Sequence, residues 1–316
     1  MHHRARRRIK HGLVQFYKLG VRAGVFVIPV HYYASEPDII ELAARREEWA
    51  RPSSLPGLSV DLDEQAATLE CVCGPFASEY GDAAATFTQA TESGIGLGYG
   101  YIEAQALHGV VRYFRPRKIV EVGSGVSTAC AARSIERNAT EGYTCTLTCI
   151  EPHPSAQLRR LVARTPGMSI RASRVQRVGV DTFTELGKND ILFIDSSHVV
   201  RAGGDVNYLV LEVLPLLEPG VLVHVHDIFL PYDYQPDVLD TFFHWNETSL
   251  VRAFLAFNDR YRILFCMSHL HHSRRAALHA AFPDYRPAML ERGLATKGAG
   301  PGAHFPSSLW LQVADV

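Results

Sequence analysis

The chain has 316 residues, of which 47% are hydrophobic and 21% charged, and its formal net charge is −1 at pH 7. This length exceeds the usual size of one hydrophobic core, so we expect one large domain with an extension. The charge balance gives no general basis for binding nucleic acid, and no apolar run is long enough to form a transmembrane segment. The six cysteines lack a disulfide spacing, which favours a reducing compartment and a cytoplasmic location.

Basic residues dominate the N-terminus, where the first acidic residue is Glu36. They lead into an apolar stretch from Gly24 to Val30, a pattern typical of a solvated basic tail with one short buried strand. The same pattern also fits an arm that contacts an acidic partner or a membrane surface. Proline and glycine clusters interrupt residues 1–95, so we interpret them as an N-terminal extension that packs on the main domain and helps to cover its site.

Residues 96–316 are predicted to form one α/β domain. Strands are predicted at 118–122, 146–151, 169–175, 190–195, 220–227, 261–267 and 309–313, and helices at 101–114, 128–138, 155–164, 206–217 and 246–258. The strands are runs of Val, Ile and Leu rather than polar–apolar alternations, which is typical of a parallel sheet covered on both faces. Such sheets bind ligands beyond the carboxyl ends of their strands, so polar residues at those ends are candidate site residues.

A glycine turn, "VEVGSGVST", follows the first of these strands and opens a helix. Gly123 and Gly125 permit a sharp turn and the close approach of a ligand. Glu151 ends the next strand, where an acid typically binds a ribose diol. Thr128 replaces the third glycine of the dinucleotide motif, and the anion of Glu121 suits an ammonium group better than a pyrophosphate. Together these features favour S-adenosylmethionine (SAM), which carries adenosine and an amino acid.

The motifs "EVGSG" and "IEP" resemble the first two motifs of the class I SAM-dependent methyltransferases. The resemblance continues through "NDILFIDSSHV", "LEVLPLLEPGVLVHVHDIFLP" and "WNETSLVRAFLAFN", and "HYYASEPD" near the N-terminus also resembles a bacterial subgroup of that superfamily. It implies a doubly wound, Rossmann-like sheet of seven strands in the order 3-2-1-4-5-7-6, with the last strand antiparallel. Arg177 departs from the common pattern, because many relatives carry an acid there near the adenine. The resemblance implies cofactor contacts from Tyr101, Glu121, Gly123, Ser124, Gly125, Ser127, Thr128, Glu151, Pro152 and Asp195.

Two neighbouring strands end in ionisable groups, within "FIDSSH" and "HVHD". Related metal-dependent O-methyltransferases hold a divalent ion at the equivalent strand ends, and Asp195, His226 and Asp227 match those positions with two changes of residue type. Imidazole and carboxylate together suit Fe, Mn, Zn, Co or Ni better than Mg. Without a metal, His198 would act as a general base, because imidazole titrates near neutral pH, and Asp195 would orient the cofactor or that base.

Other roles are expected for further polar and aromatic residues. His226, Tyr232 and Trp245 are expected to bind the acceptor. His224 faces the same side of its strand as His226 but lies deeper, so we expect it to be structural. The histidine tract at 269–272 is interpreted as a surface turn.

The leading hypothesis is a SAM-dependent methyltransferase that moves a methyl group to an oxygen or nitrogen of a small molecule, with His198 as candidate base and a possible metal ion. An NAD-dependent oxidoreductase on the same architecture is the first alternative, although Glu121 and the missing third glycine disfavour it. The second is a non-catalytic partner protein that keeps the fold and docks through its basic arm. The ionisable cluster argues against that reading.

Overall fold

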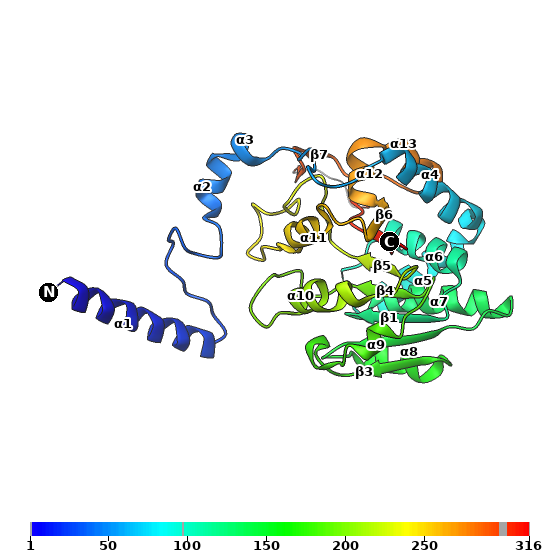
Figure 1. Ribbon diagram of the computed structural model, residues 1–316, viewed down its shortest axis with the longest axis horizontal. Helices are drawn as coiled ribbons and strands as arrows, with labels where there is room; N and C mark the ends of the chain where they lie inside the picture. The colour runs from blue at the N-terminus through cyan, green and yellow to red at the C-terminus, as the bar shows by residue number, and fades with distance from the viewer. Residues whose placement is uncertain (1, 97, 297–301, 316) are drawn as a thin grey trace. The chain divides into compact units, whose positions relative to one another are not determined.

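The computed structural model describes the backbone of residues 2–96, 98–296 and 302–315, and the side chains of this set from residue 12 onward. The chain divides into two compact units, Met1–Trp49 and Ala50–Val316 (Figure 1). The second unit includes α4 (Leu62–Cys73) and α5 (Tyr80–Ser93), so the compact units divide earlier than the predicted boundary between residues 95 and 96.

The N-terminal unit, Met1–Trp49, contains α1 (His2–Arg22) and two short helices, α2 (Ile39–Ala44) and α3 (Arg46–Trp49). Residues 24–30 form no strand and are exposed, so the predicted short buried strand is wrong. The described residues of this unit include no strand with which this stretch could pair. The side chains of Arg4, Arg6, Arg7, Arg8 and Lys10, which prompted the prediction of a basic arm, lie outside the described ones.

The second unit is built on a seven-stranded sheet with the order β3-β2-β1-β4-β5-β9-β6. Its strands are β1 (Lys118–Val122), β2 (Thr146–Ile150), β3 (Met168–Arg171), β4 (Ile191–Ile194), β5 (Leu222–Val225), β6 (Tyr261–Cys266) and β9 (Leu309–Val313). β9 pairs antiparallel with both β5 and β6, whereas β1 to β5 pair in parallel. Because β9 is the seventh strand of this sheet along the chain, the predicted order and its antiparallel last strand are confirmed.

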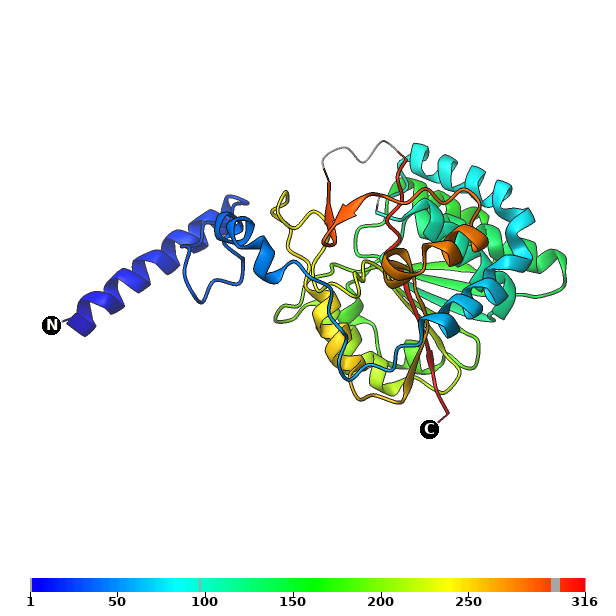
Figure 2. The same ribbon diagram turned by 90° about the horizontal axis from the view of Figure 1, so that it is seen from above.

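Helices cover both faces of the sheet (Figures 1 and 2). Along the chain they are η1 (Gly74–Glu79), α6 (Tyr101–Phe114), α7 (Val126–Thr140), α8 (Ala156–Arg164), η2 (Val175–Arg177), α9 (Asp181–Thr184), α10 (Asp205–Tyr208), η3 (Leu209–Val213), η4 (Leu214–Leu216), α11 (Glu247–Leu255), α12 (Met267–Ser273) and α13 (Arg275–Ala281). A hairpin of β7 (Leu290–Glu291) and β8 (Leu294–Ala295) follows them.

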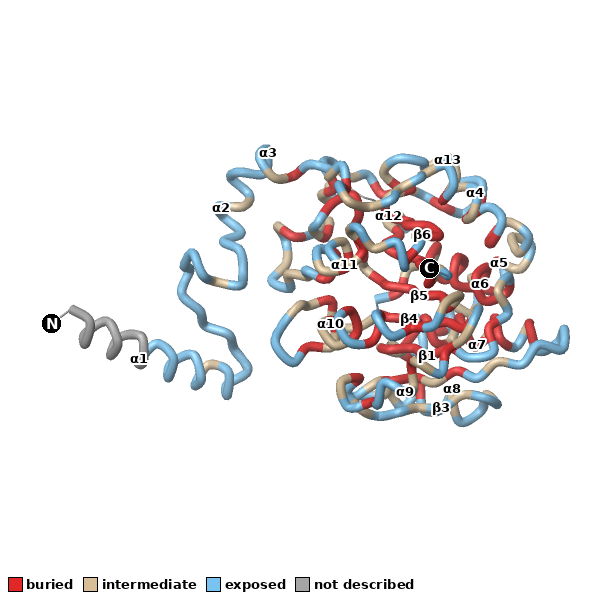
Figure 3. The backbone as a smooth tube through the Cα atoms, viewed as in Figure 1, coloured by how far each residue is buried: buried red, intermediate tan, exposed pale blue. Residues whose placement is uncertain are grey.

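Residues of the central strands alternate between two separate core clusters. On β4, for example, Ile191 and Phe193 join the cluster that includes α4, α6 and α7, whereas Leu192 and Ile194 join the cluster that includes α10 and α11. The strands are therefore buried on both faces, as their continuous apolar composition predicts (Figure 3).

The histidine tract at 269–272 is not a surface turn, so that prediction is wrong. It lies in α12, where Met267 and Leu270 are spaced to share one buried face. His271 is also buried, and its Nδ1 lies 2.5 Å from the hydroxyl of Tyr285. His224 is fully buried as expected, with Nε2 2.8 Å from Ser308 Oγ.

None of the described helices has the length and apolar character needed to cross a bilayer.

Candidate active site

The glycine turn after β1 packs directly against the end of β4. Gly123 has a φ of +78°, and a Cβ atom there would lie 1.8 Å from the backbone oxygen of Asp195. Its N–H donates to the carbonyl of Ile150 at 3.0 Å, which also joins the turn to the end of β2. Glycine is required at this position both by its conformation and by the close approach of Asp195.

Glu121 lies beneath the turn and is only 2% exposed. Ser127 Oγ and Thr128 Oγ1 donate to its carboxylate at 2.7 and 2.5 Å, and Thr128 Oγ1 also accepts from the N–H of Gly125 at 2.9 Å. Burial raises the pKa of Glu121 to about 7, against the lowering effect of these hydroxyl groups. A buried carboxyl group in this state is readily ionised by a nearby cation, as the ammonium group of an amino acid would do. Ser124, at the tip of the turn, is half-buried.

The expected ribose acid, Glu151, directly follows β2 next to β1, and Pro152 follows it. Glu151 is half-buried, and one carboxylate oxygen accepts from the N–H of His153 at 2.7 Å. Arg177 ends η2 and is exposed.

The segment before α6 contacts the turn through its backbone. A Cβ atom on Gly96 would lie 2.8 Å from the Cα of Gly125. Tyr101 stacks on His304 and its hydroxyl donates to Asp284 at 3.2 Å. The sequence prediction missed Tyr99 in this segment.

Tyr99 is buried, and its ring centroid lies 5.2 Å from that of His226 and 5.7 Å from that of Phe193. It therefore contacts the residues at the strand ends.

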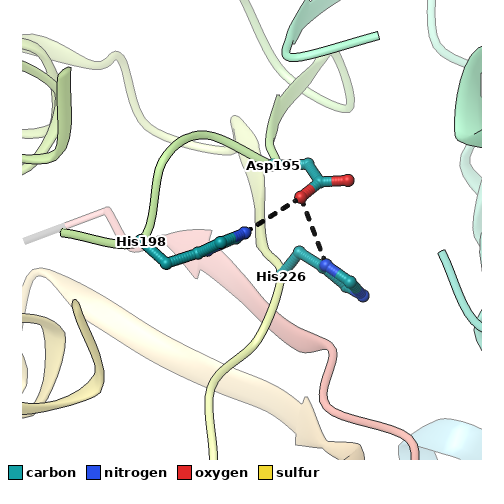
Figure 4. A group of neighbouring side chains, drawn as sticks. All are labelled: Asp195, His198 and His226. Atoms are coloured by element: carbon teal, nitrogen blue, oxygen red, sulfur yellow. Dashed lines mark hydrogen bonds and ion pairs between the residues drawn. The ribbon is translucent and has the colours of Figure 1, made fainter. Parts of the chain in front are cut away.

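The strand-end cluster, defined here as Asp195, His198, His226 and Asp227, gathers at the carboxyl ends of β4 and β5. The Oδ1 atom of Asp195 lies 3.3 Å from His198 Nε2 and 3.2 Å from His226 Nδ1 (Figure 4). The Oδ2 atom of Asp227 lies 3.6 Å and 3.5 Å from the same two nitrogens. Two imidazoles and two carboxylates thus direct one atom each toward a common point.

His198 and Asp227 hold unusual backbone conformations, with φ values of +58° and +54°. Non-glycine residues rarely adopt this region, and it recurs at ligand-binding sites that the surrounding structure holds in place. The carbonyl of His198 accepts from the N–H groups of Asn246 and Glu247 at 3.1 and 3.2 Å, which ties its turn to the start of α11.

Three outer residues fix the orientation of the strand-end cluster. Glu247 Oε2 lies 2.9 Å from His198 Nδ1, and Glu103 Oε2 lies 3.3 Å from His226 Nε2. Ser307 Oγ donates to Asp227 Oδ1 at 2.8 Å. Each histidine therefore has a carboxylate on the ring nitrogen that faces away from the common point, an arrangement that fixes its tautomer and orientation.

Sequence reasoning missed both of these glutamates. Glu103 is 3% exposed within α6, and Glu247 is 1% exposed at the start of α11. The only sequence signal for Glu103 is an acid within an otherwise apolar helix face, and Glu247 resembles an ordinary first-turn acid.

The carboxylates of the cluster raise the pKa of both histidines. Burial alone would lower the pKa of His198, but Asp195, Glu247 and Asp227 outweigh it and raise that pKa to about 10. The pKa of His226 is likewise held well above its usual range by its carboxylate neighbours, against the effect of burial. The pKa of Asp195, which burial would raise, is held well below its usual range by the two histidines. The neighbouring carboxylates therefore favour the protonated form of both imidazoles.

Aromatic rings extend from one side of the cluster. The ring of Trp245 lies 4.9 Å from that of His198, and Phe229 stacks parallel to Trp245 at 6.4 Å. Phe305 stacks on Phe229 at 6.2 Å. Tyr232, the other expected acceptor residue, is buried and packs 4.8 Å from His272.

The part of the chain that carries the strand-end cluster matches a known protein family. Residues 120–228 match a family model described as a methyltransferase domain, a range that contains the glycine turn and both strand ends. The sheet order is that expected for the class I superfamily. This part of the chain is therefore similar to the methyltransferase domain family.

Individual relatives of this methyltransferase are distant. An uncharacterized protein from Archaeoglobus fulgidus is 26% identical over 173 residues, which cover 52% of this chain and 75% of that protein. The 1,6-didemethyltoxoflavin-N1-methyltransferase of Burkholderia thailandensis, solved with its acceptor and S-adenosylhomocysteine (SAH), is 14% identical with a TM-score of 0.32, covering 84% of this chain and 94% of that one. CmcI with SAH is 17% identical with a TM-score of 0.34, covering 67% and 76%. Since these TM-scores are below 0.5, the assignment depends on the family match and on the sheet order.

Proposed function

We propose that this methyltransferase moves the methyl group of SAM to an oxygen or nitrogen of a small-molecule acceptor, with a divalent cation at the strand-end cluster. The observation that carries this proposal is the convergence of Asp195, His198, His226 and Asp227 next to the glycine turn. Methyl transfer is an in-line displacement, so the protein has to align the nucleophile with the methyl carbon and remove the nucleophile's proton.

The geometry of the cluster fits a cation. The four nitrogen–oxygen distances of 3.2 to 3.6 Å are close to the separation of about 3.4 Å between neighbouring ligands of an ion with bonds of about 2.1 Å. The atoms offered by Asp195, His198 and His226 all lie within 4.8 Å of one another. Mixed imidazole and carboxylate ligands favour Zn, Fe, Mn, Co or Ni over Mg. A bound cation of this kind lowers the pKa of an acceptor hydroxyl.

This ligand set differs in one respect from the one expected from the sequence. His198 groups with Asp195 and His226, and Asp227 lies at a slightly greater distance from both histidines. We therefore assign His198 to the ligand set as well. A general base must be unprotonated at the working pH. The carboxylates next to His198 raise its pKa to about 10, which disfavours the unprotonated form when no cation offsets their charge.

The remaining residues of the site take the roles that the resemblance implies. Glu121 and the glycine turn bind the amino-acid end of the cofactor, Glu151 its ribose, and Trp245 the acceptor next to His198. Tyr232 is buried against His272, and we assign acceptor binding to Trp245 rather than to Tyr232. We assign the methyltransferase domain to residues 96–316, with the preceding segment as a partial cover, because the carbonyl of Ile95 accepts from Ser155 Oγ at 3.0 Å. Six free cysteines support a reducing compartment such as the cytoplasm.

Metal content and methyl transfer test the proposal together. We expect about one divalent ion per chain by elemental analysis, and loss of transfer from radiolabelled SAM to small molecules of a cell extract after chelation, with recovery when the ion is restored. Binding of SAH, measured by calorimetry, should persist in the chelated protein. Full transfer by metal-free protein would exclude the cation, and absence of saturable SAH binding would exclude the methyltransferase itself.

The variant His198→Ala separates the two roles of this residue. If His198 is a ligand, the variant loses metal affinity, by about 10-fold or more, as well as transfer. If His198 is only the base, metal content stays at the wild-type level while transfer falls by about 100-fold or more. Glu136→Gln, an exposed change on α7, serves as the control.

A further inference from the structure

The surface of the N-terminal unit is unusually apolar. It has 49 of the 316 residues, yet it contains most of the large apolar side chains that are exposed in the described part of the chain. They are Leu13, Val14, Phe16, Tyr17, Leu19, Val21, Val25, Phe26, Val27, Ile28, Val30, Tyr32, Tyr33, Ile39 and Ile40. Phe16 is 57% exposed, Phe26 75% and Tyr32 91%. A concentration of exposed apolar side chains in one short stretch of chain marks a site of interaction.

Apolar and basic residues occupy different positions around α1. Positions 9, 13, 16 and 20 carry Ile, Leu, Phe and Gly, at the spacing that places residues on one side of a helix. Positions 4, 8, 11, 15, 18 and 22 repeat the same spacing and carry Arg, Arg, His, Gln, Lys and Arg. At 100° per residue the two series are offset by about 150°, with Arg6 and Lys10 next to the apolar series, so α1 is a basic amphipathic helix.

The chain after α1 turns back along the helix and enlarges its apolar surface. The N–H of Val25 donates to the carbonyl of Gly20 at 2.9 Å, and a Cβ atom on Gly20 would lie 2.9 Å from the backbone oxygen of Val25. Phe26 then stacks on Tyr17 with ring centroids 6.2 Å apart. Helix and returning segment therefore form one surface that is rich in aliphatic and aromatic side chains.

The basic and apolar composition of this surface indicates which kind of partner it binds. Arginine and lysine recur from Arg4 to Arg22, and no acidic residue precedes Glu36. A nucleic acid would match the charge but would leave the aliphatic side chains in water. An anionic membrane offers both charged headgroups for the basic series and acyl chains for the apolar one. Since no described helix can span a bilayer, α1 would lie along the membrane rather than cross it.

We propose that residues 2–33 bind the surface of an anionic lipid membrane, with α1 in the plane of the interface. This proposal is independent of the acceptor and of the metal, because the residues that carry it lie outside the strand-end cluster.

Vesicle co-sedimentation of the full chain tests this surface. We expect binding to vesicles of phosphatidylcholine with phosphatidylserine, and much weaker binding to phosphatidylcholine alone. The triple variant Arg6→Gln, Arg7→Gln, Arg8→Gln should weaken binding by about fivefold for each charge removed. Phe16→Ser and Phe26→Ser should each weaken it by about tenfold, because each removes a large apolar side chain from the acyl region.

The control variant removes three exposed arginines from α8 in the second unit, as Arg159→Gln, Arg160→Gln, Arg164→Gln, and should bind vesicles as the wild type does. Calorimetry with SAH and thermal unfolding confirm that each variant is folded. The proposal is overturned by equal binding to neutral vesicles, by no binding, or by equal losses in the control. Unchanged vesicle binding by both Phe variants would also overturn the proposal. So would a concentration-dependent dimer that the Phe variants abolish and that added lipid does not dissociate, because the apolar surface would then bind a second copy of the chain.

Discussion

Every side chain of the strand-end cluster is held from two sides. His198 contacts Asp195 and Glu247 through its two ring nitrogens, and His226 contacts Asp195 and Glu103 in the same way. Buried ionic groups are costly to leave unpaired, so a change to one partner also alters the orientation and charge of the others. Single substitutions in the cluster are therefore expected to lower both stability and activity, which makes metal content a more specific measurement than activity alone.

Glu121 gives a pH-dependent prediction for cofactor binding. Its pKa is raised to about 7 from an ordinary value of 4.5, so between these values the folded protein holds a proton that the unfolded chain has lost. The stability that Glu121 contributes is thus present at low pH and is lost as the pH rises toward 7. The ammonium group of the cofactor requires the ionised form, so SAH affinity should fall by about tenfold per pH unit below about pH 7.

The variant Glu121→Gln removes this titration while keeping the shape of the side chain. Calorimetric titration with SAH from about pH 5.5 to 8 should then show weaker binding with a nearly flat pH dependence. The exposed change Glu136→Gln should keep the wild-type slope. An unaltered slope in Glu121→Gln would show that another group controls cofactor affinity.

At the scale of elements, the turn between β1 and α7 and the end of β4 form one structural unit. Gly123 and Gly142 both have positive φ values, of +78° and +87°, but only Gly123 has a neighbour within contact distance of a Cβ atom. Gly142→Ala should therefore cost about 1 kcal/mol of unfolding free energy, from backbone strain alone. Gly123→Ala adds a clash with Asp195, so its cost should be several-fold greater and SAH binding should be lost.

Denaturant unfolding and SAH calorimetry of the two variants test this prediction. Equal losses of stability would mean that the clash at Gly123 is relieved by a shift of the β4 end, and retained SAH binding in Gly123→Ala would contradict the close packing of the turn.

The strands were predictable because each is a continuous apolar run with a clear boundary, as in 118–122 and 309–313. The same reasoning failed at residues 24–30, where the composition suits a strand but the described part of the N-terminal unit offers no strand to pair with it. The cluster was only partly predictable. Asp195 and His226 follow adjacent strands, so topology places them together, whereas Glu103 lies 123 positions before His226 and reaches it through helix packing. Sequence spacing carries no signal for contacts of that kind.

At the scale of the molecule, the two compact units differ in how they are stabilised. Both hydrophobic clusters consist of residues from Leu55 onward. The described side chains of the N-terminal unit include no large buried apolar residue. The catalytic unit therefore has a complete core without the first 49 residues.

Deletion of residues 2–49 should leave the catalytic unit folded. We expect a change in Tm of no more than about 2 °C, because no core contact of that unit is removed. SAH affinity should be unchanged, while vesicle binding should be lost. A large fall in Tm would show that the deleted residues stabilise the catalytic unit, and a fall in SAH affinity alone would show that they contribute to the cofactor site.

The position of β9 has a consequence for biosynthesis. It lies between β5 and β6, although both are synthesised well before it. While the ribosome is still extending the chain, β5 therefore presents an open edge, and β6 has no neighbour to join. Insertion of β9 closes that edge and buries Trp310, the largest of the fully buried side chains. Pairing in this half of the sheet therefore waits for the synthesis of β9, and chaperones have an unpaired strand to protect until then.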